Sequence, residues 1–237
     1  GADAAHVPAA TTWKDLSPSA KDATFNTAED GSAWTADGYS FGGGSYATAS
    51  GTVSLGTVAT VQAVTKTTIE TLRESMGVNG NQWSMFIGGK SRGLNDACNI
   101  YYNKGNKKFV FKNANGGNAD LLQDNWDGRY LTAIRNGNDK YLFSGAALPS
   151  SPSASGSQSS MGEVQFWLGS ADGGSGSFAA RYFKGPLNAI RLYSRVLENK
   201  ELAWNRAVDE ARFFGASTVV PESSLPASAN PNAIIAS

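Results

Sequence analysis

Two side chains that could bind a sugar alternate with apolar residues in the stretch EVQFWLG, residues 163–169. Because successive side chains of a β-strand point to opposite faces, Gln165 and Trp167 share one face. The other face carries three apolar side chains, Val164, Phe166 and Leu168. An exposed ring packs against the C–H face of a sugar, and a nearby amide orients the sugar's hydroxyl groups. If the apolar face points to the core, Trp167 and Gln165 are therefore candidate carbohydrate-binding residues.

A second set of ring and amide side chains follows the same reasoning. The stretch CNIYY has three apolar side chains at alternate positions, Cys98, Ile100 and Tyr102. If these face the core, Asn99 and Tyr101 point away from it, while Trp126 stands beside Asp127 in the polar stretch QDNWDG. We expect these side chains to join Trp167 in one patch on a sheet or at its rim. The alternative is that a loop or the tail of the chain covers the rings, which would then serve packing alone.

Histidine and cysteine each occur once, which restricts the available chemistry. A single cysteine, Cys98, excludes an intramolecular disulfide and a cysteine-based zinc site. Its apolar surroundings in the sequence predict a buried thiol. The single histidine, His6, lies in a terminal segment, so we expect neither a Ser–His–Asp arrangement nor a multi-histidine metal site.

Composition and charge narrow the class of protein. The chain of 237 residues has 20 basic and 20 acidic side chains, so its formal net charge is +0. This balance gives no electrostatic reason to expect nucleic acid or an anionic membrane as a partner. No apolar run approaches the about 20 residues of a membrane span, so we expect no membrane insertion. The chain begins at Gly1 without a signal peptide, and we interpret it as a mature or excised segment of an exported protein.

The elements that must position these residues read as short strands joined by glycine-rich turns. Asn136-Gly137 stands between two apolar runs and is typical of a two-residue hairpin turn. In QWSMFIGG the alternation predicts that Trp83, Met85 and Ile87 share one face. Because no helical pattern separates these strands, we predict an antiparallel sandwich or barrel.

The pattern changes near the C-terminus. Ile190 and Leu192 alternate with other residues, which indicates a strand over residues 187–195. Apolar side chains then recur at the spacing of one helix face, at Trp204, Ala207, Val208 and Ala211. We expect this face to dock on the sheets and Gly215 to end the helix. Residues 216–237 have the composition of a linker, and we expect part of them to pack on the domain.

Three segments carry a resemblance to a known family. TTWKDLSPSAKDATF matches a W-x-D-x-S…(D/N)-A element at Trp13, Asp15, Ser17, Asp22 and Ala23. YLTAIRNGNDKYLFSG matches a strand, hairpin and strand that end in glycine. FWLGSADGG…YFKGPLNAIRLYSRVLENKEL matches a closing pattern of F-x-G, an apolar strand, Y-x-R-x-L and E-(I/L). Together they resemble the laminin G-like jellyroll domains of bacterial surface and secreted proteins, in the concanavalin A-like lectin/glucanase superfamily.

The resemblance implies an all-β fold. Two antiparallel sheets would form a jellyroll sandwich, with one short C-terminal helix covering apolar surface that the sheets leave open. We therefore assign residues 1–215 to one domain and residues 216–237 to a tail. The superfamily includes glycan lectins, polysaccharide-cleaving enzymes and adhesion modules, so the fold alone does not give the function.

Catalytic carboxylates in the glucanases of this superfamily stand on one strand as E-x-D-x-x-E, a spacing that suits retaining chemistry. This chain has no such pattern, and we expect it not to be an enzyme. The stretch SADGGSGSF matches the S-x-D-x-G-x-T-W box of sialidases only at Ser170, Asp172 and Gly174, and we interpret it as an ordinary turn.

Calcium is a possibility that the resemblance raises, because many such domains hold an ion at a loop edge. Calcium takes six to eight oxygen ligands. Asp124 and Asp127 in QDNWDG and Asp15 in WKDLS are the candidate ligands, although no D-x-D-x-D-G loop is present. Each carboxylate can equally belong to a capped or solvated turn, so no cofactor is certain.

We thus expect a non-enzymatic binding module of an extracellular or cell-surface bacterial protein, with glycan binding as the leading hypothesis. The alternative is a structural or adhesion domain that contacts an extracellular or cell-surface protein and has no sugar site. A polysaccharide-cleaving enzyme is a remote alternative. A smooth outer face with covered rings would favour adhesion, and exposed rings beside amide or carboxylate groups would favour glycan binding.

Overall fold

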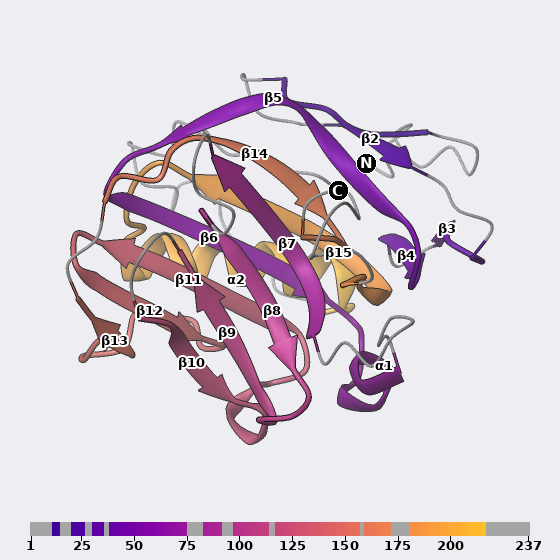
Figure 1. Cartoon of the computed structure of the whole chain (residues 1–237). Coiled ribbons are helices and arrows are strands. Elements are labelled where there is room, and N and C mark those ends of the chain that lie inside the picture. The colour runs from indigo at the N-terminus through magenta and orange to yellow at the C-terminus, as the bar shows by residue number, and fades with distance from the viewer. Residues whose placement is uncertain are drawn as a thin grey trace.

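Two antiparallel sheets face each other across one apolar core (Figure 1). The computed structural model describes residues 11–14, 20–26, 30–35, 38–74, 83–91, 97–113, 117–156, 159–171 and 181–216. Every strand pair in this part of the chain is antiparallel. The expected all-β sandwich with a short C-terminal helix is therefore confirmed.

The eight-stranded sheet carries most of the candidate residues. Its order is β1 (Thr12–Trp13), β2 (Ala23–Asn26), β5 (Tyr46–Leu55), β14 (Gly162–Leu168), β7 (Trp83–Ser91), β8 (Asn99–Asn103), β9 (Lys108–Lys112) and β10 (Ala119–Leu122). The 3-10 turn η1 (Gln123–Asn125) follows β10.

The seven-stranded sheet forms the second layer. Its order is β13 (Ala154–Ser155), β12 (Asp139–Phe143), β11 (Tyr130–Asn136), β6 (Val58–Thr65), β15 (Lys184–Tyr193), β4 (Gly38–Gly42) and β3 (Ala33–Thr35). The predicted hairpin joins β11 to β12 and is confirmed, but Asn136 pairs with Asp139, so the two turn residues are Gly137 and Asn138 and not Asn136 and Gly137. A short helix, α1 (Ile69–Glu74), follows β6.

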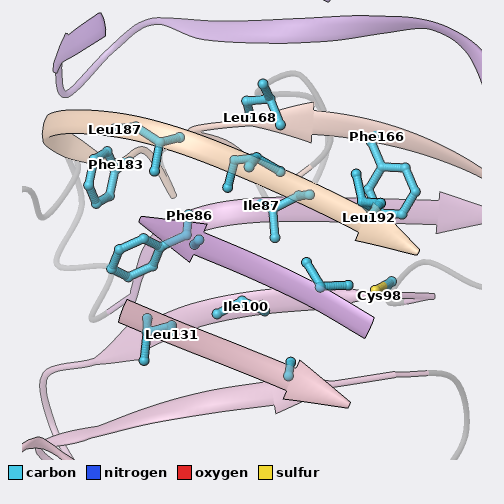
Figure 2. Close-up of a cluster of buried hydrophobic side chains, with 14 of the residues drawn as sticks. Phe86, Ile87, Cys98, Ile100, Leu131, Phe166, Leu168, Phe183, Leu187 and Leu192 are labelled. Atoms are coloured by element: carbon cyan, nitrogen blue, oxygen red, sulfur yellow. The ribbon is translucent and has the colours of Figure 1, made fainter. Parts of the chain in front are cut away.

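Strand alternation fills the space between the sheets. Val164, Phe166 and Leu168 belong to the main buried cluster together with Cys98 and Ile100, as the pattern predicted. Figure 2 shows Phe166 and Leu168 of β14 facing Leu187 and Leu192 of β15. Cys98 lies at one end of this cluster as a buried free thiol, which confirms the prediction for it.

The prediction for β7 is wrong in one respect. Ile87 belongs to the main cluster, whereas Met85 and Trp83 pack with Tyr101 on the outer face of the same sheet. A β-bulge between Met85 and Ile87 adds one residue to β7, and a shift of one residue moves side chains to the other face.

The helix α2 (Asn199–Phe213) covers the outer face of the seven-stranded sheet, behind β6, β11 and β15 in Figure 1. A capping box of Glu198 and Glu201 begins it, because each side chain accepts a hydrogen bond from the other residue's backbone N–H. The helix ends before Gly215, which has a φ of 72° and confirms the predicted stop.

The docking face of α2 differs from the prediction. Leu202 and Asp209 are the buried members together with Glu201, whereas Trp204 is half-buried and Ala211 is exposed. Asp209 receives two hydrogen bonds from Arg191 of β15, one of them at 2.7 Å from Nη1 to Oδ2. The ion pair of the buried Asp209 therefore determines which face of α2 packs on the sheet. Hydrophobic periodicity could not predict this, because it does not assign a charged residue to the buried face.

The helices in the described ranges include none that is long and apolar enough to span a membrane. Residues 217–237 lie outside the described part of the chain, so the packing of the tail stays a prediction.

Candidate functional site

Trp167 stands on the outer face of the eight-stranded sheet. Its neighbours in β14, Phe166 and Leu168, are buried in the core, while Trp167 itself is half-buried. In the described part of the chain it belongs to none of the buried apolar clusters. No described residue accepts a hydrogen bond from its indole N–H. The ring is therefore partly exposed, and its donor has no acceptor among the described residues.

Two threonines continue a row from Trp167 across the sheet. Trp167 pairs with Thr48 of β5, and Thr48 pairs with Thr24 of β2. Directly paired residues lie on the same face with their Cβ atoms about 5 Å apart. The chain neighbours of the two threonines point into the core, so the threonines themselves point outward. These neighbours are Ala23, Phe25, Ala47 and Ala49. Within the described ranges neither threonine hydroxyl has a protein partner, so the row offers two free hydroxyl groups beside the ring.

Gln165 is the next outward residue of β14. Its Nε2 donates to the backbone carbonyl of Ala49 at 2.7 Å, which fixes the orientation of the amide. No described residue donates to its Oε1, which remains a free acceptor. Lys90 of β7 pairs directly with Gln165, so its side chain starts from the same face of the sheet. We call Thr24, Thr48, Lys90, Gln165 and Trp167 the outer-face site.

A backbone segment forms one wall of the outer-face site. Gly88 of β7 is the partner of Trp167 on the side opposite to Thr48. A Cβ atom at Gly88 would lie 2.3 Å from the carbonyl oxygen of Ala171 and 2.4 Å from that of Ser170. The chain leaving β14 therefore crosses directly over Gly88, and only glycine fits beneath it.

More rings lie near the outer-face site on the same face. Tyr46, on β5 next to the row, stacks on Tyr182 with ring centroids 6.4 Å apart, and its hydroxyl accepts a hydrogen bond from Asn26. The Arg181 guanidinium lies 3.8 Å above the ring of Trp83. These contacts make the surroundings aromatic and cationic.

Asn99 and Tyr101 point away from the main core but are covered. Tyr101 is buried against Met85, Val110 and Ala171 on the outer face. The Asn99 amide oxygen accepts a hydrogen bond from the Gly89 N–H at 2.8 Å and is buried as well. These two candidates therefore match the alternative that an outward ring is covered, and we leave them out of the outer-face site.

Trp126 and Asp127 lie elsewhere in the molecule. Trp126 packs on Phe109 from the core side, with ring centroids 4.7 Å apart, and its indole N–H donates to the Tyr130 carbonyl at 3.0 Å. Phe109 is on β9, three strands from β14, which corresponds to about 14 Å. The structure therefore does not bring Trp126 together with Trp167, and the predicted single patch divides into separate groups.

The carboxylate of Asp127 is engaged within the protein. Oδ1 accepts hydrogen bonds from the backbone N–H groups of Arg129 and Tyr130, each at 2.9 Å. Oδ2 forms an ion pair with Arg206 of α2 at 2.7 Å. Asp127 thus caps a turn and anchors the helix.

The calcium candidates do not form a cluster in the described ranges, where no three His, Cys, Asp or Glu side chains gather into a possible metal site. Asp124 is exposed in η1, and Asp15 lies outside the described residues. Calcium binding at these residues stays a prediction.

Sequence reasoning missed Thr24, Thr48 and Lys90. They join Trp167 and Gln165 only through the register of β2, β5, β14 and β7, whose residues lie far apart in the sequence. No local motif marks them.

Comparison with known proteins places the fold among solved structures. No protein-family model and no curated protein matches the chain. Three solved structures of Trypanosoma rangeli sialidase are similar to it: one bound to a difluorinated 2-keto-3-deoxy-nononic acid (TM-score 0.54, 15% identity), one bound to sialic acid (0.52, 15%) and a mutant with trans-sialidase activity (0.51, 13%). They cover 81%, 84% and 84% of this chain, respectively. At these identities the likeness shows the fold alone.

The expectation that this chain is not an enzyme needs correction. The three solved structures described above, which are similar to this chain in fold, are sialidases, and sialidases are enzymes. The chain spans 30% to 31% of the length of these sialidases. The missing E-x-D-x-x-E pattern thus excludes one catalytic arrangement and does not exclude catalysis as such. Of the SADGGSGSF stretch, residues 172–178 lie outside the described residues.

Proposed function

We propose that this chain is a glycan-binding module whose ligand lies on the outer-face site. The observation that carries the proposal is the half-buried indole of Trp167, whose N–H has no acceptor among the described residues. Sugars combine an apolar C–H face with hydroxyl groups on its rim, so a ring flanked by polar side chains is the complement they need. The hydroxyl groups of Thr24 and Thr48 and the amide oxygen of Gln165 supply the polar partners.

The fold supports this proposal. One of the similar sialidases is in complex with sialic acid, which is a sugar. We further propose that residues 1–215 form a laminin G-like jellyroll of the concanavalin A-like superfamily, with residues 216–237 as a tail. We place it in an extracellular or cell-surface bacterial protein, consistent with the Ser-, Thr-, Asn- and Gly-rich surface that 17% charged residues imply.

A glycan array on the purified chain, with and without calcium, tests the proposal. Trp167→Ala should abolish binding because it removes the platform. Trp204→Ala is the matched control, since Trp204 is also a half-buried tryptophan but lies on α2, which covers the other sheet. Binding that survives Trp167→Ala, or that disappears equally in both variants, would contradict the proposed site.

A structural or adhesion domain is the second candidate, favoured by one observation. The rings of Tyr101 and Trp126 serve packing, which leaves a smaller exposed aromatic surface than the sequence suggested. An array without any bound glycan in either condition would favour this function, with an extracellular protein as the partner.

A further inference from the structure

The side of α2 that turns away from the seven-stranded sheet is apolar. Leu202 and Asp209 are buried and mark the side that faces the sheet, where Asp209 pairs with Arg191 of β15. With 3.6 residues per turn, the other side of the helix carries a different set of positions. These positions, which we call the α2 outward face, are Ala203, Trp204, Ala207, Val208 and Ala211, and each is half-buried or exposed. The solvent side of a surface helix normally carries charged or polar residues, so this face is unusual.

No described residue packs an apolar side chain on the α2 outward face as part of a buried cluster. Trp204 and Val208 belong to none of the four apolar clusters in the described ranges, even as partly buried neighbours. The indole of Trp204 has no ring contact or hydrogen bond within the same ranges. Lys200 is the charged residue beside this face, and it already pairs with Glu198 at 3.0 Å. An apolar face of this kind marks an interaction surface.

The chain itself continues next to this face with an apolar segment. Gly215 has a φ of 72°, and the N–H of Ala216 donates to the carbonyl of Glu210 at 3.0 Å, so the chain folds back over the last turn of α2. The sequence VVPESSL, residues 219–225, then follows with three apolar side chains and a single charge, Glu222. Its proline, Pro221, disfavours a helix and favours an extended conformation.

The reach of this segment matches the length of the face. An extended chain spans about 3.3 Å per residue, and a helix rises about 1.5 Å per residue. Val220 lies four residues beyond Ala216 and can reach back about 13 Å, to the level of Val208, which is about 12 Å from Ala216 along the helix. Leu225 lies nine residues beyond Ala216 and can reach about 30 Å, past Trp204 at about 18 Å.

Two arguments favour this segment over a second copy of the chain. A segment on a short tether acts at an effective concentration in the millimolar range, whereas a second copy acts only at its bulk concentration. The face is also small, because α2 has 15 residues and a length of about 22 Å. One helix face of this length provides much less than the about 800 Å² per partner that stable complexes bury.

We propose that residues 219–225 dock on the α2 outward face as an extended segment that runs antiparallel to the helix. Val219 and Val220 pack on Val208 and Ala211, and Leu225 packs on Trp204. The folded domain then extends beyond Gly215 to Leu225. This contact is independent of the outer-face site, because α2 lies on the other sheet.

Urea unfolding of paired variants tests the docking. Trp204→Ala should lower the midpoint in the wild-type chain. It should cause no further shift in a chain that carries Val219→Ser, Val220→Ser and Leu225→Ser, because residues in contact have non-additive effects. Additive shifts in this set would overturn the proposal.

The matched control is a change elsewhere in the same tail. Ile234→Ser with Ile235→Ser removes two apolar side chains outside the docking segment. In that background Trp204→Ala should lower the midpoint as much as in the wild-type chain. If the shift disappears there instead, the proposed segment is the wrong one.

Sedimentation velocity at increasing protein concentration tests the competing occupant. The wild-type chain should remain monomeric, because the face is covered from within the same chain. A dimer that Trp204→Ala abolishes would show that a second copy occupies the face, and it would refute docking of residues 219–225.

Discussion

Trp167 and Thr48 are direct partners across β14 and β5, so an indole lies beside a hydroxyl that has no partner among the described residues, on the outer face of the sheet. Thr48→Val should remove the hydroxyl without changing the shape of the side chain. We expect glycan binding to weaken by about 0.5–1.5 kcal/mol, the contribution of one hydrogen bond, with little change in stability. Titration calorimetry together with urea unfolding measures both effects.

Thr57→Val is the control for this change, because Thr57 is exposed and lies in the turn between β5 and β6. It should leave the affinity unchanged. Equal losses in the two variants would mean that Thr48 does not contact the ligand.

Gly88→Ala should destabilise the protein, because the new Cβ would lie 2.3 Å from the Ala171 carbonyl oxygen. A contact this close to backbone atoms forces a shift, and overpacking of this kind costs about 1–3 kcal/mol. Gly56→Ala is the matched control, since nothing lies within 4 Å of a Cβ there. Chemical denaturation of both variants would show the difference, and similar midpoints would argue against the close crossing.

Replacing only one member of the buried ion pair between Arg191 and Asp209 should lower the free energy of unfolding strongly. Asp209→Asn or Arg191→Met leaves an uncompensated buried group, and we expect a loss of about 3–5 kcal/mol in the free energy of unfolding. Replacing both residues, as Arg191→Met with Asp209→Leu, should recover much of this loss. Lys200→Met, at an exposed ion pair with Glu198, should change stability by no more than about 0.5 kcal/mol.

Cys98 and Lys140 should shift the pH dependence of stability in opposite directions. The folded pKa of Cys98 is about 12 against 9.0 for the free thiol, so its contribution is complete below pH 9 and is lost as the pH rises to 12. The folded pKa of Lys140 is about 8 against 10.5, so its contribution grows from pH 8 to pH 10.5. Each slope reaches at most about 1.4 kcal/mol per pH unit.

Between pH 9 and pH 10.5 the two effects oppose each other, so each variant is measured separately. Lys140→Met should leave a stability that only falls with pH over this range, whereas Cys98→Ala should leave one that rises between pH 8 and pH 9, before loss of protons from tyrosines such as Tyr130 in the unfolded chain reverses the slope. Urea unfolding between pH 8 and pH 10.5 records the slopes. If both variants follow the wild-type curve, neither group titrates as described.

Much of this fold could be predicted because its signals are local. The alternation in β14 separates Phe166 from Trp167 within two residues, and Asn136-Gly137 marks its hairpin directly. The bulge in β7 could not be predicted, because the sequence near Met85 contains no pattern that indicates an extra residue in the strand. The docking face of α2 was missed because Asp209 is buried there. A charged side chain is expected at the surface, and only its ion pair with Arg191 of β15 explains its burial.

The candidate site was predictable only in part. Trp167 and Gln165 follow from local alternation, whereas Thr24 and Thr48 join them through pairing across the sheet. The cover over Tyr101 includes Ala171, seventy positions further along the chain. Such contacts depend on the tertiary arrangement, and periodicity in the sequence has no information about them.

The crossing of Ser170 and Ala171 over Gly88 gives the outer face a closed side. From Thr24 to Trp167 the row covers two strand spacings, about 10 Å, which is room for roughly two sugar rings. An oligosaccharide lying along the row could extend past β2, but the backbone of Ser170 and Ala171 would block it beyond Trp167. This geometry suits the terminal units of a glycan better than a stretch in the middle of a polymer.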